Sequence, residues 1–302
     1  MASEKKEKNA DDKLKKAKKQ KKPKKEIEPE FKTSLLNTQV LNYKVYYMSG
    51  KEKFLYRVLA FIAGAALGYL FYGGLGSNDD GSPRLITYIL DIIICVVIGM
   101  LAVKFFIPIR CEQLNVKRTN SLRRQFMDLL DSLAASVASG NNAVKAFEAA
   151  LTDLTMQHGE DSHIAEEVKL ILKGQENAID IDALLTDFGK RSGIREIESF
   201  AQVFALSYRR GGDFGKIIRD SYEILYSKLN IEMEIATKTA ATRNELNIMM
   251  CAPVLLMVMV KASGGDFSAN FRSLIGVVAI TVGLVITGLA YYIGRRITDI
   301  EV

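Results

Sequence analysis

The chain has 302 residues, of which 48% are hydrophobic and 25% charged, and its net charge is +6 at pH 7. The positive charge belongs to one end: residues 1–53 contain 16 lysines against eight acidic residues, whereas the remainder carries 25 basic and 27 acidic residues. This distribution argues against nucleic-acid binding by the folded part. The three cysteines lie in or beside apolar runs without a short metal-type spacing, which excludes a C-x-x-C redox pair.

The amino-terminal residues 1–53 are predicted to be a disordered, lysine-rich tail, because residues 1–30 have almost nothing to bury. The first apolar run begins only after these polar residues, so we expect an attached anchor rather than a cleaved signal peptide. The tail has two interpretations. It is either a solvated tether or an arm that binds a membrane surface or a partner, since each lysine near an anionic leaflet contributes about 1 kcal/mol.

Four apolar runs follow along the chain, and each approaches the roughly 20 residues that cross a hydrocarbon core of about 30 Å. They are Phe54–Leu75, Leu85–Ile109, Leu246–Val260 and Leu274–Ile293. We predict one transmembrane hairpin over residues 54–109, with spans 54–75 and 85–109, and a second over residues 246–302, with spans 246–262 and 274–293. The third run is short and contains Pro253, so a re-entrant helix is the alternative there.

Basic residues indicate the orientation of these spans. Lysines fill the tail, and basic residues follow the second and fourth spans: Arg110, Lys117, Arg118, Arg123, Arg124, Arg295 and Arg296. The connections within the two hairpins, Ser77–Arg84 and Lys261–Ser273, carry few. Because positive charge is retained on the cytoplasmic side, we expect both termini and the middle region to be cytoplasmic in a multi-pass protein of the inner membrane.

Asp91 lies about two turns into the second span. An acid inside a membrane is a functional candidate by default, which makes Asp91 a possible intramembrane polar site. The alternative interpretation is an acid near the outer interface that a neighbour such as Tyr88 or Arg84 satisfies.

The middle region, residues 110–245, is predicted to be a cytoplasmic all-α domain, because its apolar residues recur every three or four positions. The stripes are Phe126, Leu129, Leu130, Leu133 and Val137; Val144, Phe147, Leu151 and Leu154; Ile164, Val168 and Ile171; Leu184, Leu185 and Phe188; Ile197, Phe200 and Phe204. Gly140 is expected to end the first helix and Gly174 the third, and Asn141 or Asn142 to cap the second. A polar loop is expected over Gln157–Ser162.

Gly211 and Gly212 predict a sharp turn after these helices, and Asp213 is expected to cap the next one. From Phe214 the apolar periodicity runs without a breaker into the third span. About 30 residues at 1.5 Å each make a rod of about 45 Å between domain and membrane.

Motifs for catalysis are weak. The sequence Gly-Gly-Asp-Phe occurs at Gly211–Phe214 and Gly264–Phe267, but in diguanylate cyclases this motif lies in an α/β domain for which the chain has no room. A phosphate loop needs Ser or Thr where this chain has Ile217. His158 and His163, five apart, do not complete a metal set. We therefore predict no catalytic, cofactor-binding or metal site, no enzyme activity, and energy supplied by a partner.

Seven stretches of the middle region are informative together: Gln125–Leu130, Ala138–Gly140, Ala143–Leu151, Ala183–Arg191, Phe200–Arg210, Gly211–Phe214 and Ile217–Leu225. In their order, these helices and turns resemble the type II secretion F domain over about Arg123–Pro253. One copy of the domain with two spans before and two after is similar to the TadB/TadC branch of tight-adherence (Flp-type) pili. Other platform proteins of this family usually carry two copies and three spans.

The resemblance implies a non-enzymatic inner-membrane platform for a pilus or secretion machine. Its cytoplasmic domain would meet a hexameric assembly ATPase, its membrane part would engage pilin subunits, and it would pair with a paralogous platform protein or with itself. It implies no catalytic residues, and the lysine-rich tail lies outside the family pattern. The alternative from another class is a small four-helix channel or transporter, which Asp91 alone supports poorly.

Overall fold

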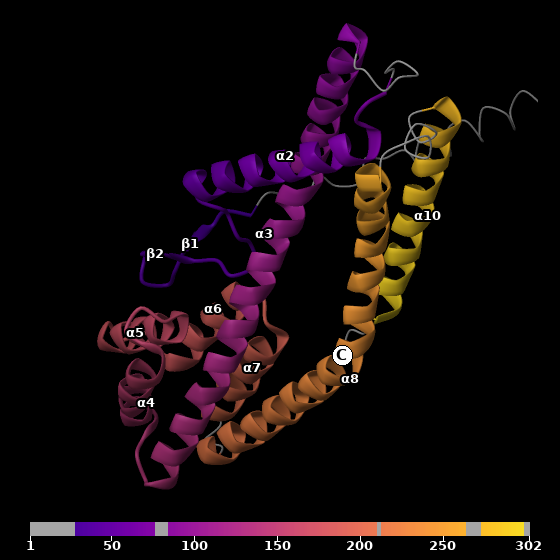
Figure 1. Cartoon of the computed structure of the whole chain (residues 1–302). Helices are drawn as coiled ribbons and strands as arrows, with labels where there is room; N and C mark the ends of the chain where they lie inside the picture. Colours follow the sequence, from indigo (N-terminus) through magenta and orange to yellow (C-terminus); the bar gives the residue numbers. More distant parts are fainter. Residues whose placement is uncertain (1–27, 76–83, 210–212, 264–272, 299–302) are drawn as a thin grey trace, which may run out of the picture.

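The structure is a computed structural model, and it describes residues 28–75, 84–209, 213–263 and 273–298 (Figure 1). Its elements in chain order are β1 (Phe31–Thr33), β2 (Gln39–Leu41), α2 (Gly50–Tyr72), α3 (Leu85–Ala138), α4 (Ala143–His158), α5 (His163–Glu176), α6 (Ile181–Ser192), α7 (Arg195–Arg209), α8 (Phe214–Ser263) and α10 (Leu274–Thr298). The all-α prediction is confirmed, since the described part contains only one two-stranded sheet besides helices.

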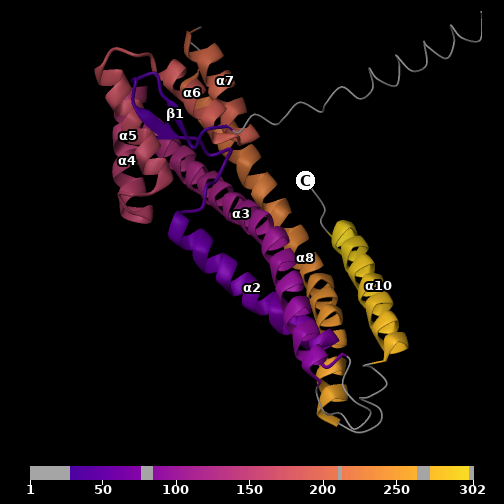
Figure 2. The same cartoon turned by 90° about the horizontal axis from the view of Figure 1, so that it is seen from above.

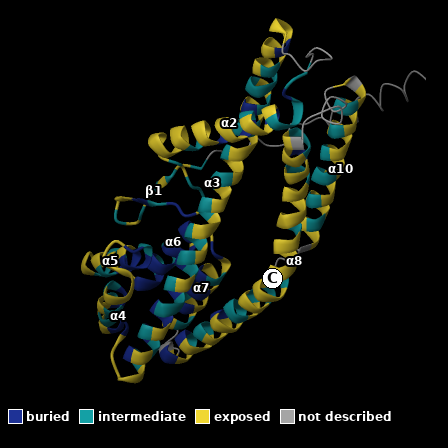
Figure 3. Cartoon of the chain, viewed as in Figure 1, coloured by how far each residue is buried: buried dark blue, intermediate teal, exposed yellow. Residues whose placement is uncertain are grey.

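Four helices are long and apolar enough to cross a membrane, as predicted: Gly50–Tyr72, part of Leu85–Ala138, part of Gly215–Ala262 and Ile275–Ile297. Their apolar side chains are largely exposed, whereas buried residues gather in the bundle of α4 to α7 (Figure 3). Exposed apolar surface of this extent is what hydrocarbon covers in a membrane protein. The four helices therefore indicate a multi-pass membrane protein.

Helix α3 is unbroken over 54 residues, so the second span and the first helix of the bundle are one element. Pro108 lies inside it. The predicted domain boundary at residue 110 lies inside this helix. A proline within a helix removes one backbone hydrogen bond, but it does not force the helix to end.

Helix α8 likewise runs without interruption for 50 residues from Phe214 to Ser263, as the periodicity predicts. It passes through Pro253, so the third run belongs to one continuous helix that is long and apolar enough to cross a membrane. Helices α3 and α8 lie together at the bundle and diverge beyond it, and the far end of α8 then comes back toward the first hairpin (Figure 1).

The bundle core is built from the predicted stripes. Phe126 of α3 makes an edge contact with Phe200 of α7, at 5.5 Å between ring centroids, and lies 6.3 Å from Phe188 of α6. All three rings are buried, and Ile218 and Leu225 add the first turns of α8 to the same cluster. Such aromatic contacts add to the stabilisation from apolar burial. The two long helices are therefore part of the core and not merely attached to it.

The first hairpin packs α2 against α3 through glycines (Figure 2). A Cβ atom on Gly64 would lie 2.5 Å from Cβ of Ala102 and 3.1 Å from Cα of Gly99. Small residues let membrane helices approach this closely.

Residues 28–49 differ from the predicted disordered tail. Strands β1 and β2 pair antiparallel, with Phe31 opposite Leu41 and Thr33 opposite Gln39. Val40 and Tyr43 are buried against the bundle. The composition of residues 1–53 concealed this, because the lysine density of the first part masks a more apolar second part. The predicted disorder of residues 1–27 lies outside the described residues.

Gly174 does not end its helix, since α5 continues to Glu176. A Cβ atom at Gly174 would meet Leu184 of α6 at 2.5 Å, so the glycine permits a close helix approach. The predicted loop over 157–162 is also shorter, because His158 is the last residue of α4 and His163 the first of α5.

Candidate functional site

A charged joint ties α3, α7 and α8 together where the bundle meets the long helices. Arg123 Nη1 of α3 donates to both carboxylate oxygens of Glu232 on α8, at 3.1 Å each. Lys228 Nζ of α8 donates to Glu196 Oε1 of α7 at 2.6 Å. Arg123 Nε lies 3.7 Å from Glu196 Oε2, which is an ion pair too long to be a hydrogen bond. The joint therefore couples α3 to α8 both directly and through α7.

Glu196 responds to this environment. Burial opposes the ionised carboxylate, but the hydrogen bond from Lys228 and the charge of Arg123 outweigh it and lower the pKa of Glu196. The carboxylate therefore stays charged, and the joint remains intact, at neutral pH.

The second feature is a connecting segment, residues 42–49, which we call the strap. It connects β2 to α2, and so joins the bundle to the first membrane helix by a path separate from α3 and α8. Its residue Tyr43 is 1% exposed. A segment buried this deeply contributes to the fold and is more than a connection.

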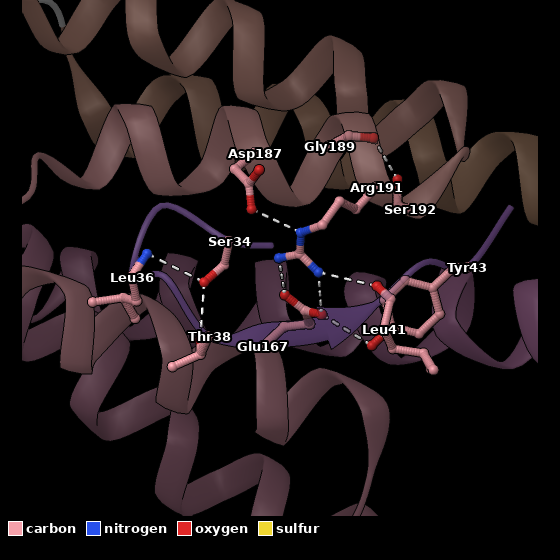
Figure 4. Close-up of polar contacts among 10 residues, drawn as sticks. All are labelled: Ser34, Leu36, Thr38, Leu41, Tyr43, Glu167, Asp187, Gly189, Arg191 and Ser192. Carbon is pink, nitrogen blue, oxygen red and sulfur yellow. Dashed lines mark hydrogen bonds and ion pairs between the residues drawn. The ribbon is translucent and has the colours of Figure 1, made fainter. Parts of the chain in front are cut away.

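A buried clamp holds the start of the strap (Figure 4). Arg191 of α6 donates to both oxygens of Glu167 on α5, at 2.9 and 2.7 Å, and its Nε donates to Asp187 Oδ2 at 2.7 Å. Its Nη1 also donates to the carbonyl oxygen of Leu41 at 3.2 Å. Two-pronged pairing of guanidinium and carboxylate fixes geometry as well as charge.

Tyr43 completes the clamp. Its hydroxyl donates to Glu167 Oε1 at 3.1 Å, and its backbone N–H donates to the carbonyl oxygen of Arg191 at 3.1 Å. Burial, with the adjacent charge of Glu167, raises the pKa of Tyr43, so the hydroxyl stays protonated and remains a donor. Burial lowers the pKa of Arg191, but its bonds to Glu167 and Asp187 raise it overall.

Beyond the clamp the strap follows α3 toward the membrane. Arg118 Nη2 donates to the carbonyl oxygen of Val45 at 2.6 Å, and the guanidinium lies over the ring of Tyr46 at 5.1 Å. One to two turns further along, Cys111 Sγ donates to the carbonyl oxygen of Tyr46 at 2.9 Å. Burial lowers the pKa of Arg118 without removing its charge at neutral pH. The strap and α3 thus run as a bonded pair.

The opposite ends of the membrane helices carry a second set of polar contacts. Lys261 Nζ of α8 donates to the carbonyl oxygens of Tyr69 and Gly73 at 2.9 and 3.1 Å. A cation at a helix C-terminus is stabilised by the partial negative charge of the last carbonyl groups. The contact of Lys261 therefore joins the end of α2 to the second hairpin. Asp91 Oδ1 accepts the Gly74 N–H at 2.9 Å. Gly74 was not among the neighbours, Tyr88 and Arg84, that the sequence suggested for Asp91.

The remaining predicted cap and turn residues occupy helix ends. Gly140 has φ +86°, just beyond the end of α3. Asn142 accepts the Lys145 N–H at 3.0 Å at the start of α4, and Asp213 Oδ1 accepts the Lys216 N–H at 3.0 Å at the start of α8. Gly211 and Gly212 lie outside the described residues.

Within the described ranges, no group of three or more His, Cys, Asp or Glu side chains could hold a metal ion. His158 bonds Asp128 at 2.8 Å, and half-buried His163 packs its ring edge-on against Tyr43. Sequence reasoning did not find the clamp. The i, i+4 spacing of Asp187 and Arg191 could have drawn attention to it, but nothing local points to Glu167 or Tyr43.

Residues 129–261 match the family model described as "Type II secretion system (T2SS), protein F". The matched segment begins within α3 and ends at Lys261 of α8, so it includes the bundle but not the strap or α2. No curated protein and no solved structure matches the chain. The match supports the type II secretion F family and, in general terms, a platform role in secretion or pilus assembly.

Proposed function

We propose that this chain, with its T2SS protein F segment, is the inner-membrane platform of a tight-adherence (Flp-type) pilus or a related type II secretion machine. A hexameric assembly ATPase would act on the bundle of α4 to α7, and pilin subunits would engage the membrane helices. The single domain copy, with two candidate spans on each side, supports the TadB/TadC branch. The chain itself would hydrolyse no nucleotide.

The continuity of α3 and α8 carries this proposal. Each helix runs from a candidate span into the core of the bundle, so a displacement of the bundle moves the membrane helices directly. A helix rises about 1.5 Å per residue. Because its length is fixed, it transmits a displacement from one end to the other, which a flexible linker does not. The joint of Arg123, Glu232, Glu196 and Lys228 holds the two helices at a fixed separation near the bundle.

The orientation belongs to the same proposal. Basic residues lie near the bundle ends of the spans, at Lys53, Arg57, Arg110 and Arg295, which supports a cytoplasmic bundle and cytoplasmic termini. Cysteine labelling from outside intact cells tests this. A cysteine introduced by Glu148→Cys on α4 should stay unlabelled until the cells are opened, and labelling in intact cells would contradict the orientation.

The coupling is tested by breaking the rod at two exposed positions. Ala240 and Ala241 of α8 are exposed and lie between the bundle and the third span. The double variant Ala240→Gly, Ala241→Pro interrupts the helix, because proline in a helix interior costs about 3 kcal/mol and removes a hydrogen bond. We expect normal membrane insertion but loss of surface pili or of secretion.

The matched control is Ala240→Gln, Ala241→Gln, which changes the same positions but keeps helix-forming residues. It should assemble pili at the level of the unmodified chain. Normal assembly in the proline variant would contradict mechanical coupling through α8.

A further inference from the structure

Apolar side chains stay exposed along one flank of the bundle, where α7 and α8 pack against each other. Val203 of α7 is 49% exposed, and Ile224 and Ile231 of α8 are 69% and 49% exposed. Lipid covers such side chains in the spans, but Ile231 lies about 22 Å along the helix from the third predicted span, 246–262. Exposed apolar side chains that are grouped beside charged ones are typical of protein–protein contacts.

Two of these side chains, Val203 and Ile224, line a groove between α7 and α8 with a volume of about 290 Å³. Glu196 and Lys228 line the same groove and bond each other. Because Glu196 is near the start of α7 and Lys228 is about four turns into α8, the two helices run antiparallel, and these charges lie at the end away from Val203. Small-molecule pockets begin at about 300 Å³. The groove therefore fits the inserted side chains of a partner better than a cofactor.

The charged end of the groove has one cation to spare. Arg195 lines this end and is exposed, and its guanidinium forms no hydrogen bond or ion pair with any residue that the structure describes. Lys228 beside it is already paired with Glu196. The unpaired charge at this end is therefore positive, and it is complementary to a carboxylate on the partner.

We propose that an amphipathic helix of the assembly ATPase docks in the α7–α8 groove, with its apolar face on Val203 and Ile224 and a carboxylate at Arg195. A helix fills such a groove with apolar side chains three, four and seven positions apart. This inference rests on the proposed function, because it takes the motor as the occupant. Glu196 and Lys228 belong to the charged joint, so a helix seated here pushes on α7 and α8 where they are bonded to α3.

The substitution Ile224→Asp tests the apolar contact. Because the side chain of Ile224 is largely exposed, the chain should still fold. The full chain in lipid discs is titrated with the purified assembly ATPase of the same system, and the Kd is measured. We expect binding to weaken at least about tenfold, since an apolar contact is lost and a charge is placed in the groove.

The matched control is Met233→Asp. Met233 is also exposed, at 60%, and it lies nine positions further along α8, which at 3.6 residues per turn places it on the opposite side of the helix from Ile224. Its Kd should equal that of the unmodified chain.

The substitution Arg195→Glu tests the charged contact. A glutamate in the first turn of a helix is favourable, so α7 is retained, but the new charge repels the carboxylate of the partner. We expect at least about threefold weaker binding at low salt, and a smaller difference at high salt. Equal Kd values for Arg195→Glu and the unmodified chain would overturn the charged contact.

The outcomes separate this inference from the function on which it rests. If the unmodified chain binds the ATPase and Ile224→Asp binds it equally well, the groove is not the docking site, but the motor remains a partner. If the unmodified chain does not bind, both proposals are overturned. If light scattering shows that Ile224→Asp only separates copies of the chain, the occupant is a second copy, which also overturns the proposal.

Discussion

Arg191 and Glu167 show how much the strap depends on a few side chains. Their side chains are 6% and 3% exposed, so neither charge can be screened by water. Arg191→Met would leave the carboxylate of Glu167 buried without a counter-charge. We expect this variant to lose about 3–5 kcal/mol of unfolding free energy, measured by denaturant unfolding of the full chain in detergent.

The control for that variant removes one partner of a solvent-exposed ion pair. This pair has the same i, i+4 spacing as Asp187 and Arg191. Lys238 bonds Glu234 at 2.7 Å, with side chains 73% and 62% exposed. Lys238→Met should change the unfolding free energy by at most about 0.5 kcal/mol. Equal losses in the two variants would show that the clamp is no stronger than a surface pair.

His163 makes the clamp region sensitive to pH. Burial, followed by the charge of Arg118, lowers the pKa of its imidazole, while Glu166 and Glu167 act in the opposite direction. The folded chain therefore binds this proton less readily than the unfolded chain, whose His titrates near 6.5. Stability is complete above about pH 6.5 and falls as the pH drops through the folded pKa. We expect the unfolding free energy to fall less steeply from pH 7.5 to 5.5 in His163→Gln. Parallel curves for the two chains would contradict this.

At the residue scale, the sequence predicted helix ends better than long-range contacts. Asn142 and Asp213 were assigned from residue types that favour N-cap positions, and that information is local. The partner of Asp91 was not predictable, because Gly74 N–H becomes available only when α2 ends beside α3. Gly174 was misjudged because glycine serves both to end helices and to let them approach.

At the scale of elements, the crossing of α2 and α3 depends on Gly64. A methyl group there would lie 2.5 Å from Ala102, and the backbone of Gly99 leaves it no room to move. We expect Gly64→Ala to lower the unfolding free energy of the full chain in detergent by about 1–3 kcal/mol, through overpacking. A thermal melt followed by circular dichroism measures this as a lower Tm.

Gly283 of α10 offers the comparison, because a Cβ atom there would meet nothing within 4 Å. Gly283→Ala should leave the Tm unchanged or raise it slightly, since alanine favours helix over glycine. If both substitutions lowered the Tm equally, close packing of α2 on α3 would not be the cause.

The helices were predictable from apolar periodicity, because their buried stripes repeat along one face. The continuity of α3 was not, since the end of the apolar run at residue 109 marks where the span ends but not whether the helix ends. The short strands β1 and β2 were missed for a different reason. Three residues each are too few for an alternating pattern, and the contact between Arg191 of α6 and the Leu41 carbonyl oxygen of β2 joins residues 150 positions apart.

At the scale of the whole molecule, three connections join the bundle to the membrane helices: α3, α8 and the strap. The charged joint and the clamp fasten them at the bundle, and Lys261 links the two hairpins at the far end. Hydropathy and charge predicted the four spans and the general architecture. They did not predict the strap, because its contacts join residues more than 60 positions apart.

The rigidity of α8 between bundle and membrane is the central claim. Glu223 and Asn247 are both exposed and lie 24 positions apart in α8, which places them about 36 Å apart along the axis. With the native cysteines replaced, spin labels introduced by Glu223→Cys and Asn247→Cys report this distance by pulsed electron resonance in lipid discs. We expect a narrow distribution of label-to-label distances centred at about 36 Å. The substitution Ala241→Pro should broaden it. A broad distribution in the unmodified helix would contradict a rigid connection between the bundle and the membrane.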